Sequence, residues 1–268
     1  MLDSLKRWIA GNRQGPEGRN LEGWARQRKL SLKRVRDNGG LVIEGALLGK
    51  PWRMEWGPPQ RDYIEGRELR LRMDLGLPPE LQMAVLSKTL AETLEQRAYA
   101  VFTQDTQTRI DSGMPEEVRW LAMFPKTAVP AMRPVRARFS SIAVEPESLT
   151  AWLNVDLAAQ LEAATREWLA EAQPFVMMTL RGRLYLRTAA AQPDVALLDG
   201  VLALVEVAAR RAQAAGDAAR AREGLKGRGG SEGTGRTTAF ADTSVEAAPG
   251  VPGAPQGATA WGPLPPLD

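Results

Sequence analysis

The sequence predicts an α+β fold, in which a mostly antiparallel sheet of about six to eight strands carries long helices packed chiefly on one face. Two patterns lead to this prediction. Several short segments alternate apolar and polar residues with a period of two, which is typical of antiparallel strands with one buried face. Longer segments with apolar residues at helical spacing follow these strands along the chain.

The clearest strand pattern is at residues 51–56, where Trp52, Met54 and Trp56 alternate with charged residues. Residues 68–75 repeat the pattern with leucine and methionine. A turn at residues 181–182 indicates a hairpin. The remaining strands are expected at residues 30–32, 41–43, 118–124, 135–144, 175–180 and 183–187.

Helices are expected between and after these strands. Pro79 suits a first helical turn and Asp156 suits an N-cap. A strand, a short loop and a proline-started helix occur in this order twice, from residue 68 and from residue 183. A strand–loop–helix pseudo-repeat is therefore possible, although unrelated units of this kind look alike. The expected helices span residues 79–102, 147–153, 156–172 and 194–223.

Three segments organise the chain. Residues 1–24 read as a short amphipathic helix and a linker, and residues 25–223 as a single α+β domain. Residues 224–268 contain 10 Gly and 6 Pro and few large apolar residues, which predicts a disordered tail. No segment approaches the roughly 20 apolar residues that would span a bilayer. The sequence therefore favours a cytoplasmic location, and its excess of arginine over lysine is typical of GC-rich bacterial genomes.

The absence of His and Cys narrows the chemistry more than any motif does. It removes the commonest general base, the thiolate nucleophile and the usual ligands of transition metals. We therefore expect no cofactor and no metal site. The most favoured function is a non-catalytic protein-interaction or adaptor protein of the bacterial cytoplasm, with an unidentified protein partner.

A small-molecule pocket, or an enzyme based on carboxylates and arginine, is the alternative. Aromatic and arginine side chains come close together in the two clearest strands, so Trp52, Trp56, Arg70 and Arg72 could line a cavity. The other interpretation places the tryptophans in the core. The charged residues of the first strand would then pair across strands with Arg70 or Arg72.

A basic stretch near the front offers a possible but weak nucleic-acid site. Its alternation with apolar residues also fits an edge strand protected by charge. The stretch comprises Arg26, Arg28, Lys29, Lys33, Arg34 and Arg36.

Three further segments carry weaker hypotheses. Residues 1–10 have the composition of a small membrane-surface anchor, although a docked or frayed helix explains them as well. Residues 230–237 match a phosphate-binding loop except that Arg236 replaces its lysine, and linker composition produces such matches freely. The stretch WGPLPPLD at residues 261–268 contains a P-x-x-P motif, which can dock into grooves as a polyproline II helix.

Overall fold

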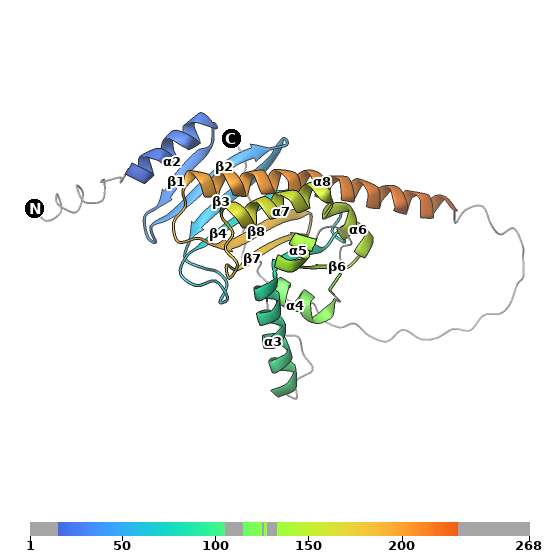
Figure 1. Cartoon of the computed structure of the whole chain (residues 1–268). Coiled ribbons are helices and arrows are strands. Elements are labelled where there is room, and N and C mark those ends of the chain that lie inside the picture. Colours follow the sequence, from blue (N-terminus) through green and yellow to red (C-terminus); the bar gives the residue numbers. More distant parts are fainter. Residues whose placement is uncertain (1–15, 105–114, 125, 128–132, 230–268) are drawn as a thin grey trace, which may run out of the picture.

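The computed structural model describes residues 16–104, 115–124, 126–127 and 133–229 (Figure 1). Eight strands form one antiparallel sheet in the order β1-β2-β3-β4-β8-β7-β5-β6. The α+β fold with an antiparallel sheet is therefore confirmed. The strands are β1 (Ser31–Val35), β2 (Gly40–Leu47), β3 (Lys50–Gly57), β4 (Glu68–Asp74), β5 (Met83–Ser87), β6 (Phe139–Ala143), β7 (Phe175–Leu180) and β8 (Arg183–Ala189).

Helices pack on both faces of this sheet. The register puts Val85 on one face of β5, and its neighbour Leu86 on the other. Val85 belongs to a core shared with α2, α6, α7 and α8, whereas Leu86 belongs to a second core shared with α3 and α4. The expectation of helices chiefly on one face thus describes α7 and α8 but not α3. The helices are α2 (Pro16–Gln27), α3 (Lys88–Gln104), α4 (Glu116–Met123), α5 (Arg133–Arg138), α6 (Pro146–Trp152), α7 (Val155–Glu167) and α8 (Val195–Gly229).

Helix α8 runs along the sheet beside α7 (Figure 1). Its buried face is built from small and branched residues such as Val201, Leu204 and Ala208. The buried Trp152 of α6 fixes the packing, because its indole N–H donates to the carbonyl of Ala208 over 3.0 Å. This long packed helix explains why most of the apolar core lies on one side of the sheet.

The second core covers only part of the opposite face. Its sheet residues come from β5, β6, β7 and β8, together with Tyr63 and Ile64 from the β3–β4 connection. On β1 to β4 the same face carries mostly charged side chains, among them Arg53, Glu55 and Arg70. The sheet therefore has one apolar face, and an opposite face that is half apolar and half ionic.

The predicted helix at 79–102 is wrong at its start. Residues 83–87 form β5, and α3 begins at Lys88. All five residues of β5 are buried because helices cover both faces of this strand. A strand buried on both sides is a continuous apolar run, which periodicity cannot distinguish from a buried helix.

Two predicted strands are also helical. The expected strand at 118–124 lies in α4, whose buried residues Glu117, Val118, Trp120 and Leu121 follow helical spacing. The expected strand at 135–144 begins as α5, and only 139–143 are strand. β-branched and aromatic residues favoured a strand prediction in both segments. In α4 the positions at which these residues pack in the folded protein are those of a helix instead.

The boundaries of other elements shift. Asn154, not Asp156, caps α7, since its side-chain oxygen accepts from two backbone N–H groups, and α7 ends at Glu167 rather than 172. The linker expected before residue 25 instead forms most of α2, and Trp24 lies in the core. Helix α8 continues to Gly229, past the boundary expected at 223.

The strand–loop–helix pseudo-repeat is not present in this form. Strand β8 leads directly to α8, whereas β5 stands between β4 and α3. Strands β4 and β8 are neighbours in the sheet, with Leu71 opposite Leu186. They look alike because they share one environment, apolar toward α8 and polar on the other side.

Candidate functional site

The predicted pocket residues lie on opposite faces of the sheet. Trp52 and Trp56 lie on the face of the sheet that packs against α2, α6, α7 and α8, in the larger of the two cores. Arg70 and Arg72 follow the residues of β4 that face this core, so their side chains are on the other face. Arg70 instead forms the predicted cross-strand pair, because its Nη2 lies 2.6 Å from Glu55 Oε2.

Charged side chains cross β1, β2, β3, β4 and β8 in a continuous ladder on the less covered face. Each carboxylate lies between two cations, as Glu55 lies between Arg53 and Arg70. Burial would raise the pKa of Glu55, but hydrogen bonds from these two arginines hold it below its ordinary value. The ladder runs Lys33, Glu44, Arg53, Glu55, Arg70, Glu68 and Arg187.

The ladder ends in a buried ion pair. Glu68 is 0% and Arg187 3% exposed, and the Arg187 guanidinium donates to Glu68 Oε1. The backbone N–H of Gln60 also donates to Glu68, over 2.7 Å. This pair joins β4 to β8 and holds the β3–β4 connection over them. The ladder therefore links these five strands through ion pairs across the sheet.

A second buried cluster fixes α4. Glu117 Oε1 accepts from Arg61 Nε over 2.7 Å and from Tyr63 Oη over 2.5 Å. Burial would raise the pKa of Glu117, but the charge of Arg61 and these two hydrogen bonds hold it below its ordinary value. Burial and the nearby Glu117 raise the pKa of Tyr63 well above its ordinary value. The cluster therefore orients α4 by tying its first turn to the β3–β4 connection.

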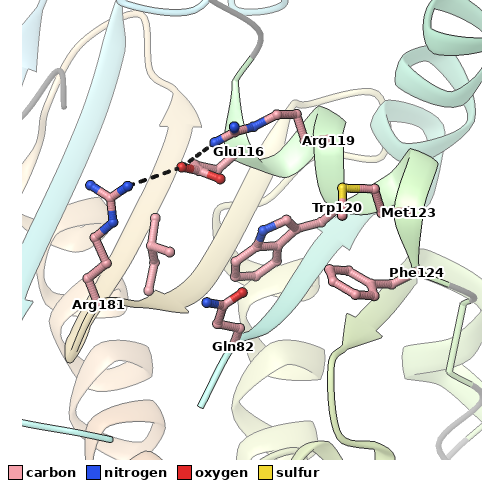
Figure 2. Close-up of a pocket in the computed structure, with 8 residues that line it drawn as sticks. Gln82, Glu116, Arg119, Trp120, Met123, Phe124 and Arg181 are labelled. Carbon is pink, nitrogen blue, oxygen red and sulfur yellow. Dashed lines mark ion pairs between the residues drawn. The ribbon is translucent and has the colours of Figure 1, made fainter. Parts of the chain in front are cut away.

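This anchoring turns another side of α4 toward solvent, where it borders a groove. Glu116, Arg119 and Met123 follow each other at spacings of three and four residues, which places them on one side of the helix. The groove holds a volume of about 450 Å³. Its lining residues are Gln82, Glu116, Arg119, Trp120, Met123, Phe124, Leu180 and Arg181 (Figure 2).

The other wall of the groove is the turn between β7 and β8. Arg181 and Gly182 have φ values of 50° and 79°, which fit a two-residue hairpin turn with positive φ at both central positions. The Gly182 carbonyl accepts from the backbone N–H groups of Leu75 and Leu77 over 3.1 and 3.2 Å. The turn is thus held from outside the hairpin, and it presents Arg181 at the rim.

The groove has an apolar floor and a basic rim. Trp120 is 4% exposed and packs into the second core, whereas Met123 is 56% exposed beside it. Glu116 lies between Arg119 and Arg181 (Figure 2). Its Oε1 pairs closely with Arg119 and lies 3.8 Å from Arg181 Nη2.

Both arginines keep hydrogen-bonding capacity that Glu116 does not use. The Nε atom of Arg119 is buried and has no hydrogen-bond partner among the described residues, so a ligand would reach this guanidinium, whose side chain is 28% exposed, at its Nη atoms. The side chain of Arg181 is 58% exposed. A guanidinium has five N–H donors, so two of these groups facing one carboxylate leave an excess of donors and of positive charge. The arrangement can accept a further carboxylate beside an apolar side chain.

The predicted basic patch is partly neutralised. Arg28 pairs with Asp199 over 2.8 Å, Lys33 with Glu44 over 3.3 Å, and Arg34 with Glu22 over 3.7 Å. The three other members of the patch, Arg26, Lys29 and Arg36, are exposed around the end of α2 and β1. A nucleic-acid site there stays a prediction, with fewer unpaired charges than the sequence indicated.

Other predicted features lie outside the described residues. They are the segment 1–10, the motif at 230–237 and the tail beyond Gly229. Within the described part of the chain, no group of three or more carboxylates is placed to hold a metal ion. No helix in that part is long and apolar enough to cross a membrane.

Sequence reasoning missed the groove because it took residues 118–124 as a strand. The available signal was Pro115 followed by Glu116 and Glu117, which is the composition of a helix start. With a helix in place, Glu116, Arg119 and Met123 share one side of it. The contribution of Arg181 depends on strand pairing and could not be found from local spacing.

Searches against protein-family models, curated proteins and solved structures gave no match to this chain.

Proposed function

We propose that the protein is a non-catalytic protein-interaction module, and that its groove binds a short segment of a partner protein. The observation that carries this proposal is the exposed Met123, which lies with Trp120 and Phe124 beneath two arginines that share a single carboxylate. The arginine bias and the absence of Cys support a place in the bacterial cytoplasm.

The residue types of the groove favour protein binding. Aromatic residues, methionine and arginine are enriched at protein interfaces, and Trp, Tyr and Arg are enriched among their hot spots. Methionine also adapts its shape to different apolar partners. The exposed Met123, beside the buried Trp120 and the partly buried Phe124, can therefore gain contact area without unfolding the helix that carries it.

The rim specifies the chemistry of the partner segment. It should combine an aromatic or aliphatic side chain, which enters between Trp120 and Met123, with a carboxylate that reaches Arg119 and Arg181. Arginine suits this recognition because its planar fork can bind a carboxylate through two hydrogen bonds. We propose binding rather than catalysis because the chain has no His and no Cys.

Selection of random linear peptides on the immobilised full chain tests this function. We expect enriched peptides to carry Asp or Glu close to an aromatic or aliphatic residue. Their affinity, measured by fluorescence anisotropy, should fall about tenfold in Arg181→Asn, since a charge-assisted hydrogen bond contributes about 1.5 kcal/mol or more. Asparagine tolerates the positive φ of this position, so the variant removes the charge without straining the turn.

The matched control is Arg181→Lys, which keeps the positive charge but not the planar fork and should therefore lose less affinity than Arg181→Asn. The proposal is wrong if no peptide is enriched. It is also wrong if the enriched peptides bind Arg181→Asn and Met123→Gln as tightly as they bind the unmodified protein.

A further inference from the structure

The chain itself contains a segment with the chemistry that the groove requires. Residues 261–268 read WGPLPPLD and combine Trp261 and two leucines with Asp268. Three prolines in this segment favour a polyproline II conformation, which aromatic-lined grooves bind with a small loss of chain entropy. These residues lie beyond the described part of the chain.

We propose that residues 261–268 bind in the groove of the same molecule. In this arrangement Trp261 and Leu264 contact Trp120 and Met123, while the Asp268 carboxylate pairs with the arginines of the rim. The inference rests on the proposed function because it uses the same groove, and it names an occupant for it.

The direction of the chain supports binding within one molecule. The last described turns of α8 lie beside the segment that holds the groove wall, since Arg220 Nη2 donates to the carbonyl of Gly76 over 2.9 Å. A Cβ at Gly216 would lie 3.2 Å from Pro78 and 3.4 Å from Leu77. Leu77 in turn donates to Gly182 in the β7–β8 turn, next to Arg181. These turns of α8 therefore lie at the same end of the sheet as the β7–β8 turn, on the opposite face from α4.

The length of the remaining chain is sufficient. Residues 230–260 separate the end of α8 from Trp261, and a fully extended chain of this length would span about 100 Å. This distance is several times the length of a short helix such as α4. Tethering at this length gives the segment an effective concentration on the order of millimolar, so a modest intrinsic affinity would keep the groove occupied.

Charge complementarity also supports binding of the tail in the groove. Residues 230–268 contain one basic residue, Arg236, and four acidic residues, Glu232, Asp242, Glu246 and Asp268. The groove rim carries two arginines against one glutamate. The tail is therefore attracted to the rim, and a partner protein must displace it. The bound tail would act as a competitor that lowers the apparent affinity of the groove.

Disulfide trapping in the full chain tests this inference, since the absence of native Cys leaves no background reaction. The test variant carries Met123→Cys and Leu264→Cys. Met123 is mostly exposed, so its substitution should not unfold the protein. Under mild oxidation we expect a monomeric product without free thiols, formed about tenfold faster than in the control.

The control variant carries Thr150→Cys with Leu264→Cys. Thr150 is exposed on α6, the helix whose Glu147 pairs with Arg222 of α8. It therefore lies close to the end of α8, and a tail that visits all surfaces equally would react there at least as fast as at position 123. Adding Arg181→Asn to the test variant should slow trapping several-fold, and adding Arg181→Lys, which keeps the charge, should slow it less.

Equal trapping rates at positions 123 and 150 would overturn the inference. Disulfide-linked dimers in place of monomers would also overturn it, because they would mean that the tail binds a second copy. If peptide selection succeeds and trapping fails, the groove binds partners but not the tail of its own chain. If both fail, the proposed function is wrong as well.

Discussion

Replacing Arg187 with methionine tests the buried ion pair at the end of the charge ladder. The substitution leaves the carboxylate of Glu68, which is 0% exposed, without its closest cation. Removing one partner of a buried pair costs about 3–5 kcal/mol. The Gln60 N–H at 2.7 Å and the Arg70 guanidinium at 3.6 Å still face Glu68. We therefore expect a loss near the lower end, about 3 kcal/mol.

The double variant Glu68→Met with Arg187→Met distinguishes the interaction within the pair from the contacts that each residue makes with its surroundings. It removes both charges and replaces them with apolar side chains, which is often nearly neutral for stability. The Gln60 N–H then lacks its acceptor, which costs about 1–2 kcal/mol. The single variant Glu68→Met leaves the buried Arg187 without its carboxylate and should also cost about 3 kcal/mol. The double variant should therefore be more stable than the sum of the two single losses predicts, by about 4–5 kcal/mol.

Urea unfolding followed by tryptophan fluorescence measures these differences. With an m-value of about 2 kcal/mol/M, a loss of 3 kcal/mol lowers the unfolding midpoint by about 1.5 M. Arg183→Met is the control, since Arg183 pairs with Asp74 at a partly exposed position and should change stability by less than about 1 kcal/mol. The reasoning is refuted if Arg187→Met behaves like this control, or if the two single losses add in the double variant.

Three further predictions concern the core and the cluster at α4. The pKa of Glu117 is held low by Arg61 against the effect of burial. The unfolding free energy lost in Glu117→Gln should therefore be greatest above about pH 4.3 and shrink as the pH falls further. Urea unfolding of both proteins from about pH 7 to about pH 3 measures this loss, and a loss that does not change with pH would contradict the prediction. Gly45→Ala should cost about 1–3 kcal/mol, since its Cβ would lie 2.9 Å from the ring of the buried Trp52, and an unchanged urea midpoint would be the contrary result. Trp56→Ala should cost about 3 kcal/mol in the same assay, because the half-buried ring packs on the core. This value is at the lower end of the range for truncating a buried tryptophan, and a loss below about 1 kcal/mol would argue against the packing.

The strands with clear alternation could be predicted from sequence, and the elements buried on both sides could not. Residues 51–56 and 68–75 alternate because only one of their faces is apolar. The local pattern therefore predicts both that they are strands and which side chains face the core. Strand β5 has two apolar faces and shows no such pattern. Its assignment depends on α3 and α4 covering it, which is a tertiary effect.

The candidate site was less accessible to sequence reasoning than the fold. Pairing of the charged residues of the first strand with Arg70 or Arg72 was expected because cross-strand neighbours follow from alternation, and Glu55 pairs with Arg70. The groove joins α4 to a hairpin turn about 60 residues later, and no periodic signal links the two. The pocket hypothesis combined Trp52 and Trp56 with Arg70 and Arg72, although the alternation in each strand places its apolar and charged residues on opposite faces.

The affinity of a selected peptide for Met123→Gln tests the central claim most directly. Met123 is 56% exposed, so its substitution should leave the unfolding midpoint unchanged while removing apolar contact from the groove. Val155→Gln is the matched control, because Val155 is also an exposed apolar residue, at 63%, on a helix that packs on the opposite face of the sheet. The account predicts that calorimetric titration finds binding weakened about tenfold in Met123→Gln and unchanged in Val155→Gln. Equal affinities for both variants would contradict it.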